Sequence, residues 1–277
     1  MRTGSIASRF HKKLTVARLR RFGISLNSVR SSTCDIGCGM ASVDQPLSLF
    51  NEPAYRSAEV AHILGLPSGT VQAWCFGHDY RHRHDGSRKV FARVIEPADE
   101  RLRLLSFENL CELHLLAVIR RHHRVQLAQV RTAVEYMRHR LGEDRPLASG
   151  RFRTNGIDLF VEHAGELLNV SKHGQRALRE DFERALARVE YSADASQPIR
   201  LFPFTRPPAR AEEQPKSVVV DPALSFGRPV LTGAFVRTEV IEGRFQAGDS
   251  IADMAIDYGV SGSHIEEALR FEQRRSA

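Results

Sequence analysis

One residue spacing occurs twice in this chain, and it is typical of two short helices joined by a tight turn. In each copy a small residue is followed four positions later by glycine, then at once by an apolar residue, with apolar anchors six and nine positions after the glycine. The two sets are Ala61, Gly65, Leu66, Val71 and Trp74, and Ala255, Gly259, Val260, Ile265 and Ala268. The alanine lets two helices approach, the glycine turns the chain, and the last two positions anchor the second helix. The spacing therefore predicts two helix-turn-helix units.

Length and composition favour a protein of about two domains. The chain has 277 residues, 42% of them hydrophobic, and no apolar run of the ~18 residues that a membrane span requires. Its four cysteines do not form a disulfide framework at this length, so we expect a reducing, cytoplasmic location. The N-terminus lacks the continuous apolar segment of a signal peptide.

Positive charge is concentrated in residues 1–39, which hold eight Lys/Arg against one acid, a net +7. This equals the formal net charge of the whole chain, so the remainder is balanced. Residues 1–39 are interpreted either as a basic arm that contacts phosphates or as a transit peptide. A disordered extension is the third interpretation, and translation from Met40 would remove it altogether. We expect the tail to be dispensable for folding.

The overall class predicted is α+β, mainly α. Residues 40–145 are predicted to form a winged helix-turn-helix, with helices over 58–64 and 68–74, a hairpin turn at Asp85-Gly86 and a strand over 89–95. Residues 150–206 are predicted to be a middle segment in which 157–162 and 166–170 form a β-hairpin, followed by a helix over 175–191. The Pro- and Glu-rich stretch 207–216 is a linker. Residues 217–277 then form a small three-helix unit with short strands.

The N-terminal unit resembles a MerR-type winged-helix regulator. The resemblance covers residues 55–141 and rests on the helix-turn-helix pattern, the basic hairpin, and a helix pair joined through Arg120-Arg121-His122-His123-Arg124. It implies DNA binding. The stretch 78–89 is longer than a usual wing and no long dimerising coiled coil follows, so the family's effector-sensing mechanism is less well supported.

The C-terminal unit is similar to VapB-type antitoxins. The similarity covers residues 218–272 and rests on Val218-Val219-Val220-Asp221-Pro222, Ser225-Phe226-Gly227-Arg228-Pro229-Val230-Leu231-Thr232-Gly233 and the second helix-turn-helix. A long-form subgroup of that family also carries an N-terminal helix-turn-helix. The resemblance implies a partner, because such proteins bind and neutralise a PIN-domain ribonuclease encoded beside them. Ala234-Phe235 replaces a polar pair that usually follows the glycine.

Local charge assigns the two units to different partners. Residues 81–140 hold 13 Lys/Arg against seven acids, a net +6, whereas residues 217–277 hold six Arg against nine acids, a net −3. The positive charge of residues 81–140 favours binding to DNA phosphates. The negative charge of residues 217–277 disfavours phosphates and favours a basic protein surface. The DNA-binding candidates are Ser68, Thr70, Gln72, Arg81, Arg83, Arg88 and Lys89.

For the toxin we select Arg228, Arg237 and Arg244, because the metal site of a PIN ribonuclease is itself carboxylate-rich. We expect residues 217–277 to dock independently of the DNA-bound part, through the linker.

Metal binding and catalysis have weaker support in the sequence. Cys75, His78, His82 and His84 are chemically suited to a metal, but Arg81 and Arg83 lie between them and no second half-site follows. No phosphate-binding glycine loop and no hydrolase motif is present. We therefore expect no metal, no cofactor and no enzymatic activity.

The leading hypothesis is the antitoxin of a type II toxin–antitoxin pair that binds its own promoter as duplex DNA and neutralises a PIN-domain ribonuclease. We expect a homodimer or a higher hetero-oligomer, because one winged unit offers little surface for tight DNA binding. A MerR-like transcriptional regulator without a toxin partner, sensing a ligand through residues 150–206, is the alternative. An adaptor that binds no nucleic acid is a third interpretation.

Overall fold

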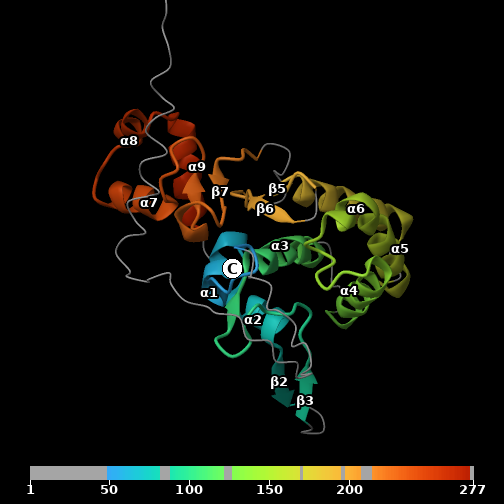
Figure 1. Ribbon diagram of the computed structural model, residues 1–277. Helices are drawn as coiled ribbons and strands as arrows, with labels where there is room; N and C mark the ends of the chain where they lie inside the picture. The colour runs from blue at the N-terminus through green and yellow to red at the C-terminus, as the bar shows by residue number, and fades with distance from the viewer. Residues whose placement is uncertain are drawn as a thin grey trace, which may run out of the picture. The chain divides into compact units, whose positions relative to one another are not determined.

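The computed structural model describes residues 49–81, 88–121, 127–168, 171–194, 197–206 and 214–274, and the structural statements below refer to these. Within them the protein is α+β and mainly helical, with small two-stranded antiparallel sheets, which confirms the predicted class (Figure 1). The basic tail 1–39, the Asp85-Gly86 turn and residues 207–213 of the predicted linker lie outside the described residues. No helix in the described part of the chain is long and apolar enough to cross a membrane.

The first described elements are two helices, a hairpin and a further strand pair. They are β1 (Tyr55–Arg56), α1 (Ser57–Leu64), α2 (Ser68–Phe76), β2 (His78–Arg81), β3 (Arg88–Phe91) and β4 (Leu104–Leu105). β1 pairs with β4 and β2 with β3, both antiparallel. The strand predicted over 89–95 is shorter, because Val94 and Ile95 turn away and donate their backbone N–H groups to the Trp74 carbonyl.

Helix α3 (Phe107–Arg121) lies at the centre of the main core, and α4 (Leu127–Leu141) follows it. Leu110 and Leu113 of α3 are fully buried, and the apolar cluster around them extends from Tyr55 to Phe271. One continuous core thus joins residues from both ends of the described chain.

The predicted hairpin of residues 157–170 is wrong. Residues 157–168 form α5 (Ile157–Leu168), entered through a π-helical turn, η1 (Phe152–Gly156), and residues 169–170 lie outside the described part of the chain. Phe160 explains the difference, since it packs edge-on against Phe152 and Phe182 with ring centroids 6.1 and 5.3 Å away. This aromatic cluster buries one helical face, and such tertiary packing overrides the local strand pattern.

After α5 come α6 (Lys172–Leu186) and the antiparallel pair β5 (Val189–Tyr191) and β6 (Pro198–Leu201). The helix predicted over 175–191 therefore starts earlier and ends before the first strand. These elements supply the α+β middle segment.

The C-terminal residues form three helices and a short β pair. The elements are β7 (Val218–Val219), the 3₁₀ turn η3 (Ser225–Gly227), β8 (Val230–Leu231), α7 (Thr238–Gln246), α8 (Ile251–Tyr258) and α9 (Gly262–Glu272). Ile241, Met254 and Ile265 fill a small core between the helices. Val220 also bridges Leu201 of β6, with paired backbone hydrogen bonds of 2.8 and 3.0 Å.

Candidate nucleic-acid interface

Both copies of the repeated spacing form two helices joined at a left-handed glycine. Gly65 ends α1 with φ 62° and Gly259 ends α8 with φ 66°. The residue after each glycine donates its N–H to the carbonyl of the alanine, Leu66 to Ala61 at 2.9 Å and Val260 to Ala255 at 3.0 Å. This hydrogen bond closes the helix end and fixes the angle to the next helix.

Helix α2 has one buried face and one exposed face. Val71, Trp74 and Cys75 are buried in the core, and burial raises the pKa of the Cys75 thiol. Trp74 is thus a core anchor, as expected. Among the predicted DNA contacts, Ser68 and Gln72 are exposed, whereas Thr70 is half-buried.

Helix α2 starts at Ser68 without a side-chain cap. Pro67 holds the cap position with an extended backbone, and Ser68 is already inside the helix. Ser68 therefore lies at the exposed N-terminal turn, where a recognition helix contacts bases.

The base of the β2–β3 hairpin is fixed to α2 and α4. Gly77, with φ 64°, starts the hairpin, and a Cβ on it would lie 2.4 Å from the Phe91 carbonyl oxygen. Arg131 of α4 donates from Nε to the Arg93 carbonyl at 3.0 Å and stacks its guanidinium over the Phe91 ring at 5.6 Å. The Trp74 carbonyl also accepts hydrogen bonds from the N–H groups of Val94 and Ile95. Together these contacts fix the orientation of the hairpin relative to α2.

The hairpin brings three of its four predicted basic residues into one ladder. In the strand register Arg81 is opposite Arg88, and Lys89 is opposite Tyr80. Arg83 lies outside the described residues. The backbone thus places these basic positions within a few residues of each other on paired strands, next in the chain to the exposed face of α2.

The end of α1 is joined to α9, a relationship that the sequence pattern did not predict. His62 Nε2 lies 2.9 Å from Glu272 Oε2, and the His62 ring packs edge-on to Phe271 at 5.3 Å. Arg274 donates to the carbonyls of His62 and Ile63, both at 3.2 Å, so it occupies the last carbonyls of α1. The helix pair α1–α2 and the helix pair α8–α9 therefore contact each other directly.

Burial acts to raise the pKa of Glu272, but its surroundings outweigh that effect. Hydrogen bonds with His62 and Thr238, and the charges of His62 and Arg274, place the pKa of this carboxyl below its ordinary value. Glu272 is thus a carboxylate at neutral pH, and it holds α1, α7 and α9 together.

Both ends of the predicted linker are held by one buried arginine. Arg188 donates to the carbonyls of Phe202 and Pro203 on one side at 2.6 and 3.3 Å, and to those of Gln214 and Pro215 on the other at 3.1 and 3.0 Å. Burial lowers the pKa of Arg188 to about 10, against the opposing effect of the Glu267 charge, so the side chain remains a cation at neutral pH. The described residues 203 and 214 are thus held close together by one side chain.

The three arginines predicted to reach a toxin are not equivalent. Arg228 is paired with Glu59 of α1. Arg244 bridges Asp249 and Asp257 at 2.5 and 2.7 Å. Arg237 contacts only the exposed Glu239 at 3.0 Å among the ion pairs of the described chain, so it is the most readily available of the three.

Exposed apolar side chains concentrate in the C-terminal unit. Of the seven large exposed hydrophobic residues in the described chain, five lie there: Phe226, Phe235, Val240, Phe245 and Ile256. Phe226 is 89% exposed and adopts a left-handed backbone with φ 57° and ψ 37°, a strained conformation for a side chain of this size. Exposed large apolar side chains are thus more frequent in this unit than in the rest of the described chain.

The possible metal ligands are only partly described. Cys75 is buried and His78 is exposed, while His82 and His84 lie outside the described residues. Across the described ranges, no group of three His, Cys, Asp or Glu side chains is placed to hold a metal ion.

Comparison with known proteins places a family match in the C-terminal unit. The family model described as "Protein of unknown function (DUF433)" matches residues 218–271. This region coincides with the β7–β8 pair and helices α7 to α9, and with the stretch that resembles VapB-type antitoxins.

Longer similarities come from two Mycobacterium tuberculosis proteins. One, named "Putative antitoxin VapB45", is 27% identical over 242 residues, which cover 82% of this chain and 97% of that protein. The other, an uncharacterized protein called Rv2308, is 24% identical over 231 residues, covering 82% of this chain and 93% of its own. The chain is therefore similar to these proteins over nearly their full length.

A solved structure shares the fold. The crystal structure of Rv2018 from Mycobacterium tuberculosis has a TM-score of 0.55 and 23% sequence identity, covering 80% of this chain and 99% of that one. The likeness extends well beyond the C-terminal unit.

Proposed function

We propose that this chain is the antitoxin of a type II toxin–antitoxin pair. The observation that carries the proposal is the similarity, over most of the chain, to a protein named as a putative antitoxin, together with the sequence motifs of the C-terminal unit that resemble VapB-type proteins. In this proposal residues 217–277 bind a PIN-domain ribonuclease and residues 55–93 bind the promoter DNA of the operon. The protein acts by binding and not as an enzyme.

The proposed DNA surface consists of the exposed face of α2 and the basic hairpin. Ser68 and Gln72 supply hydroxyl and amide groups of the kind that contact base edges. Arg81, Arg88 and Lys89 supply positive charge for the phosphates. Because Gly77 and Arg131 fix the hairpin base, α2 and the hairpin meet a duplex as one unit.

The proposed toxin surface is the exposed part of the C-terminal unit. Exposed aromatic residues such as Phe226 and Phe235 provide buried contact area on binding, as aromatic anchors do in protein interfaces. Arg237 is the arginine best placed to reach a carboxylate-rich metal site. The excess of acids in the unit suits the basic rim that holds RNA.

Fluorescence anisotropy with the full chain tests the DNA half of the proposal. A labelled duplex from upstream of the protein's own gene should bind more tightly than a scrambled duplex of equal length. Gln72→Ala should reduce this preference, whereas Gln246→Ala, which removes an exposed amide from α7, should preserve it. Equal binding of both duplexes by the unaltered protein would contradict promoter recognition.

A transcriptional regulator without a toxin partner is the second candidate. The observation that favours it is an open pocket in the middle segment, lined by Arg153 and Tyr191, because such a regulator needs a ligand site. The gene beside this one distinguishes the two: a PIN-type ribonuclease frame supports the antitoxin.

A further inference from the structure

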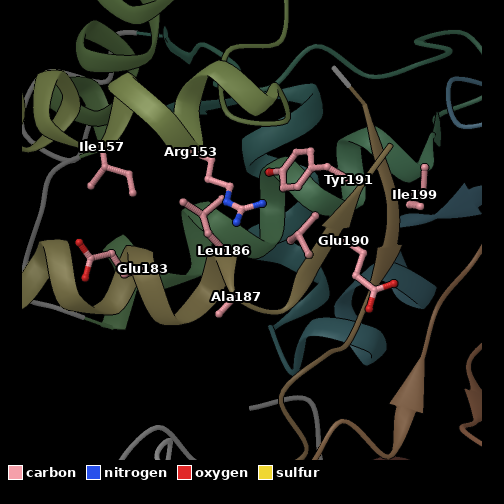
Figure 2. Close-up of a pocket in the computed structure, with 9 residues that line it drawn as sticks. Arg153, Ile157, Glu183, Leu186, Ala187, Glu190, Tyr191 and Ile199 are labelled. Carbon is pink, nitrogen blue, oxygen red and sulfur yellow. The ribbon is translucent and has the colours of Figure 1, made fainter. Parts of the chain in front are cut away.

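An open pocket of about 630 Å³ lies between η1, the C-terminal end of α6 and the β5–β6 pair (Figure 2). This volume is in the range of small-molecule sites. The lining residues are Arg153, Ile157, Glu183, Leu186, Ala187, Val189, Glu190, Tyr191 and Ile199. None of these residues belongs to the proposed DNA or toxin surfaces, so the pocket is a separate site.

Arg153 is presented to the pocket by an unusual backbone turn. It lies in η1, a single π-helical turn, and such turns are frequent at functional sites. Gly156 closes this turn, where a Cβ would lie 2.7 Å from the Phe152 ring. Within the described ranges the Arg153 guanidinium has no hydrogen bond or ion pair, so its donors are available to a ligand.

Tyr191 supplies a second donor beside the arginine. Figure 2 shows its hydroxyl pointing toward the Arg153 guanidinium. Burial, and more weakly the charge of Cys111, raise the pKa of Tyr191 against the opposing charge of Arg153, so the hydroxyl keeps its proton at neutral pH. No residue of the described chain makes a hydrogen bond with this hydroxyl.

The two acids of the lining do not neutralise Arg153. Glu190 is paired with Arg200 at 3.3 Å. Glu183 is exposed, and Figure 2 shows its carboxylate pointing away from Arg153. Among the described residues, the polar end of the pocket therefore offers one unpaired cation and one neutral donor, next to apolar side chains.

We propose that this pocket binds a small organic carboxylate. The carboxylate group is held by the Arg153 guanidinium and the Tyr191 hydroxyl, and the apolar body of the ligand packs on Leu186, Val189 and Ile199. Arginine suits this role because its planar donors match the two oxygens of a carboxylate. The pocket binds such a ligand whether or not the chain has a toxin partner.

Isothermal titration of the full chain with three probes tests this proposal. 4-Phenylbutyrate, 4-phenylbutan-1-ol and 4-phenylbutylamine share one apolar body and differ in the charge of the head group. The carboxylate should bind about tenfold more tightly than the alcohol, because a charge-assisted hydrogen bond contributes that much, and the amine should bind most weakly. Each probe is tested up to about 10 mM, the range of weak small ligands.

Variants separate a specific site from general adsorption. Arg153→Gln should reduce carboxylate affinity about tenfold and remove the preference over the alcohol. Tyr191→Phe should reduce it by a smaller factor. Arg176→Gln makes the same charge change at an exposed α6 position outside this pocket and should leave binding unaltered.

Four results would overturn the proposal. These are no measurable binding of 4-phenylbutyrate, equal binding of acid and alcohol, tightest binding of the amine, and unchanged binding by Arg153→Gln. Because Arg153 is exposed and unpaired in the described chain, its variant should fold normally, and an unaltered circular dichroism melting curve checks this.

Discussion

His62 Nε2 and Glu272 Oε2 lie 2.9 Å apart although 210 residues separate them in the chain. Their side chains are 32% and 11% exposed, so the contact is partly shielded from water. It joins the end of α1, in the proposed DNA-binding unit, to the end of α9, in the proposed toxin-binding unit. A partner that displaces α9 would therefore disturb the helix on which α2 is supported.

A double-mutant cycle measures this connection. His62→Ala and Glu272→Gln should each lower the free energy of unfolding, because each leaves a partly buried polar group without its partner. The coupling energy between them should be about 0.5–3 kcal/mol in urea titrations at pH 6. Arg176→Ala and Glu180→Gln, an exposed pair on α6, provide the control and should give a coupling near zero. Additive effects at His62 and Glu272 would show that the contact contributes nothing to stability.

Glu112 should make the protein less stable as pH rises from about 4 to 7. Burial, with a smaller contribution from the Glu108 charge, raises the pKa of this carboxyl to about 7, while Arg145 and Asn109 oppose the rise. A raised pKa stabilises the folded state below the ordinary glutamate pKa of about 4.3, and this stability is lost as pH increases through the folded-state value.

Glu112→Gln should remove this dependence while retaining an oxygen that accepts hydrogen bonds from Asn109 and Arg145, which now lie 3.1 Å from Oε2. The difference in free energy of unfolding between the variant and the unaltered protein should increase with pH between about 4 and 7. Its slope should be up to about 1.4 kcal/mol per pH unit, in favour of the variant. Urea midpoints measured from pH 4.5 to 8 test it. Parallel curves for the two proteins would show that Glu112 does not titrate there.

Gly77→Ala should destabilise the protein and displace the hairpin. Its left-handed φ of 64° is unfavourable for alanine, and the added Cβ would lie 2.4 Å from a backbone carbonyl that cannot move independently. We expect the free energy of unfolding to fall by more than about 1 kcal/mol. Gly69→Ala, in the first turn of α2 with nothing within 4 Å of the new Cβ, should be neutral or slightly stabilising. Thermal melts compare the two, and equal destabilisation by both variants would contradict this account.

The hairpin charges should determine the salt dependence of DNA binding. Replacing Arg81, Arg83, Arg88 and Lys89 with alanine should weaken binding to all sequences, because phosphate contacts carry no base information. The slope of log K against log salt should become shallower by about 0.9 for each phosphate that the variant no longer neutralises. Arg176→Ala should leave the slope unaltered. An unchanged slope in the fourfold variant would place the DNA surface elsewhere.

Features that depend only on residues close together in the chain, such as turns and helix caps, could be predicted from the sequence. Gly65 and Gly259 specify left-handed turns, so both helix pairs followed from one spacing. Ser250 is another local case, because its hydroxyl caps α8 by accepting a hydrogen bond from the Asp253 N–H at 3.1 Å, three residues along the chain. The helix at 157–168 was missed because its side-chain pattern alone also fits a strand, and only packing of Phe160 against other aromatic rings distinguishes the two.

Long-range partners could not be predicted from local patterns. No sequence pattern marks Arg188 as a buried hydrogen-bond donor, because a single arginine at the end of an amphipathic helix is usually solvated. Its role as a clamp requires the carbonyls of residues 202–203 and 214–215 to come together. The Arg153 pocket was missed for the same reason, since η1 interrupts the helical period and Tyr191 lies on a separate strand. The independent docking of residues 217–277 stays a prediction.

The most direct test of the central claim is inhibition of the adjacent PIN-domain ribonuclease by the full chain. Purified ribonuclease should cleave RNA alone and lose that activity on titration with this protein, at a fixed molar ratio and with a stable complex on gel filtration. Arg237→Glu should weaken inhibition at least tenfold, because it reverses the most available charge, while Arg176→Glu should not. Undiminished cleavage in the presence of excess folded protein would contradict the antitoxin assignment.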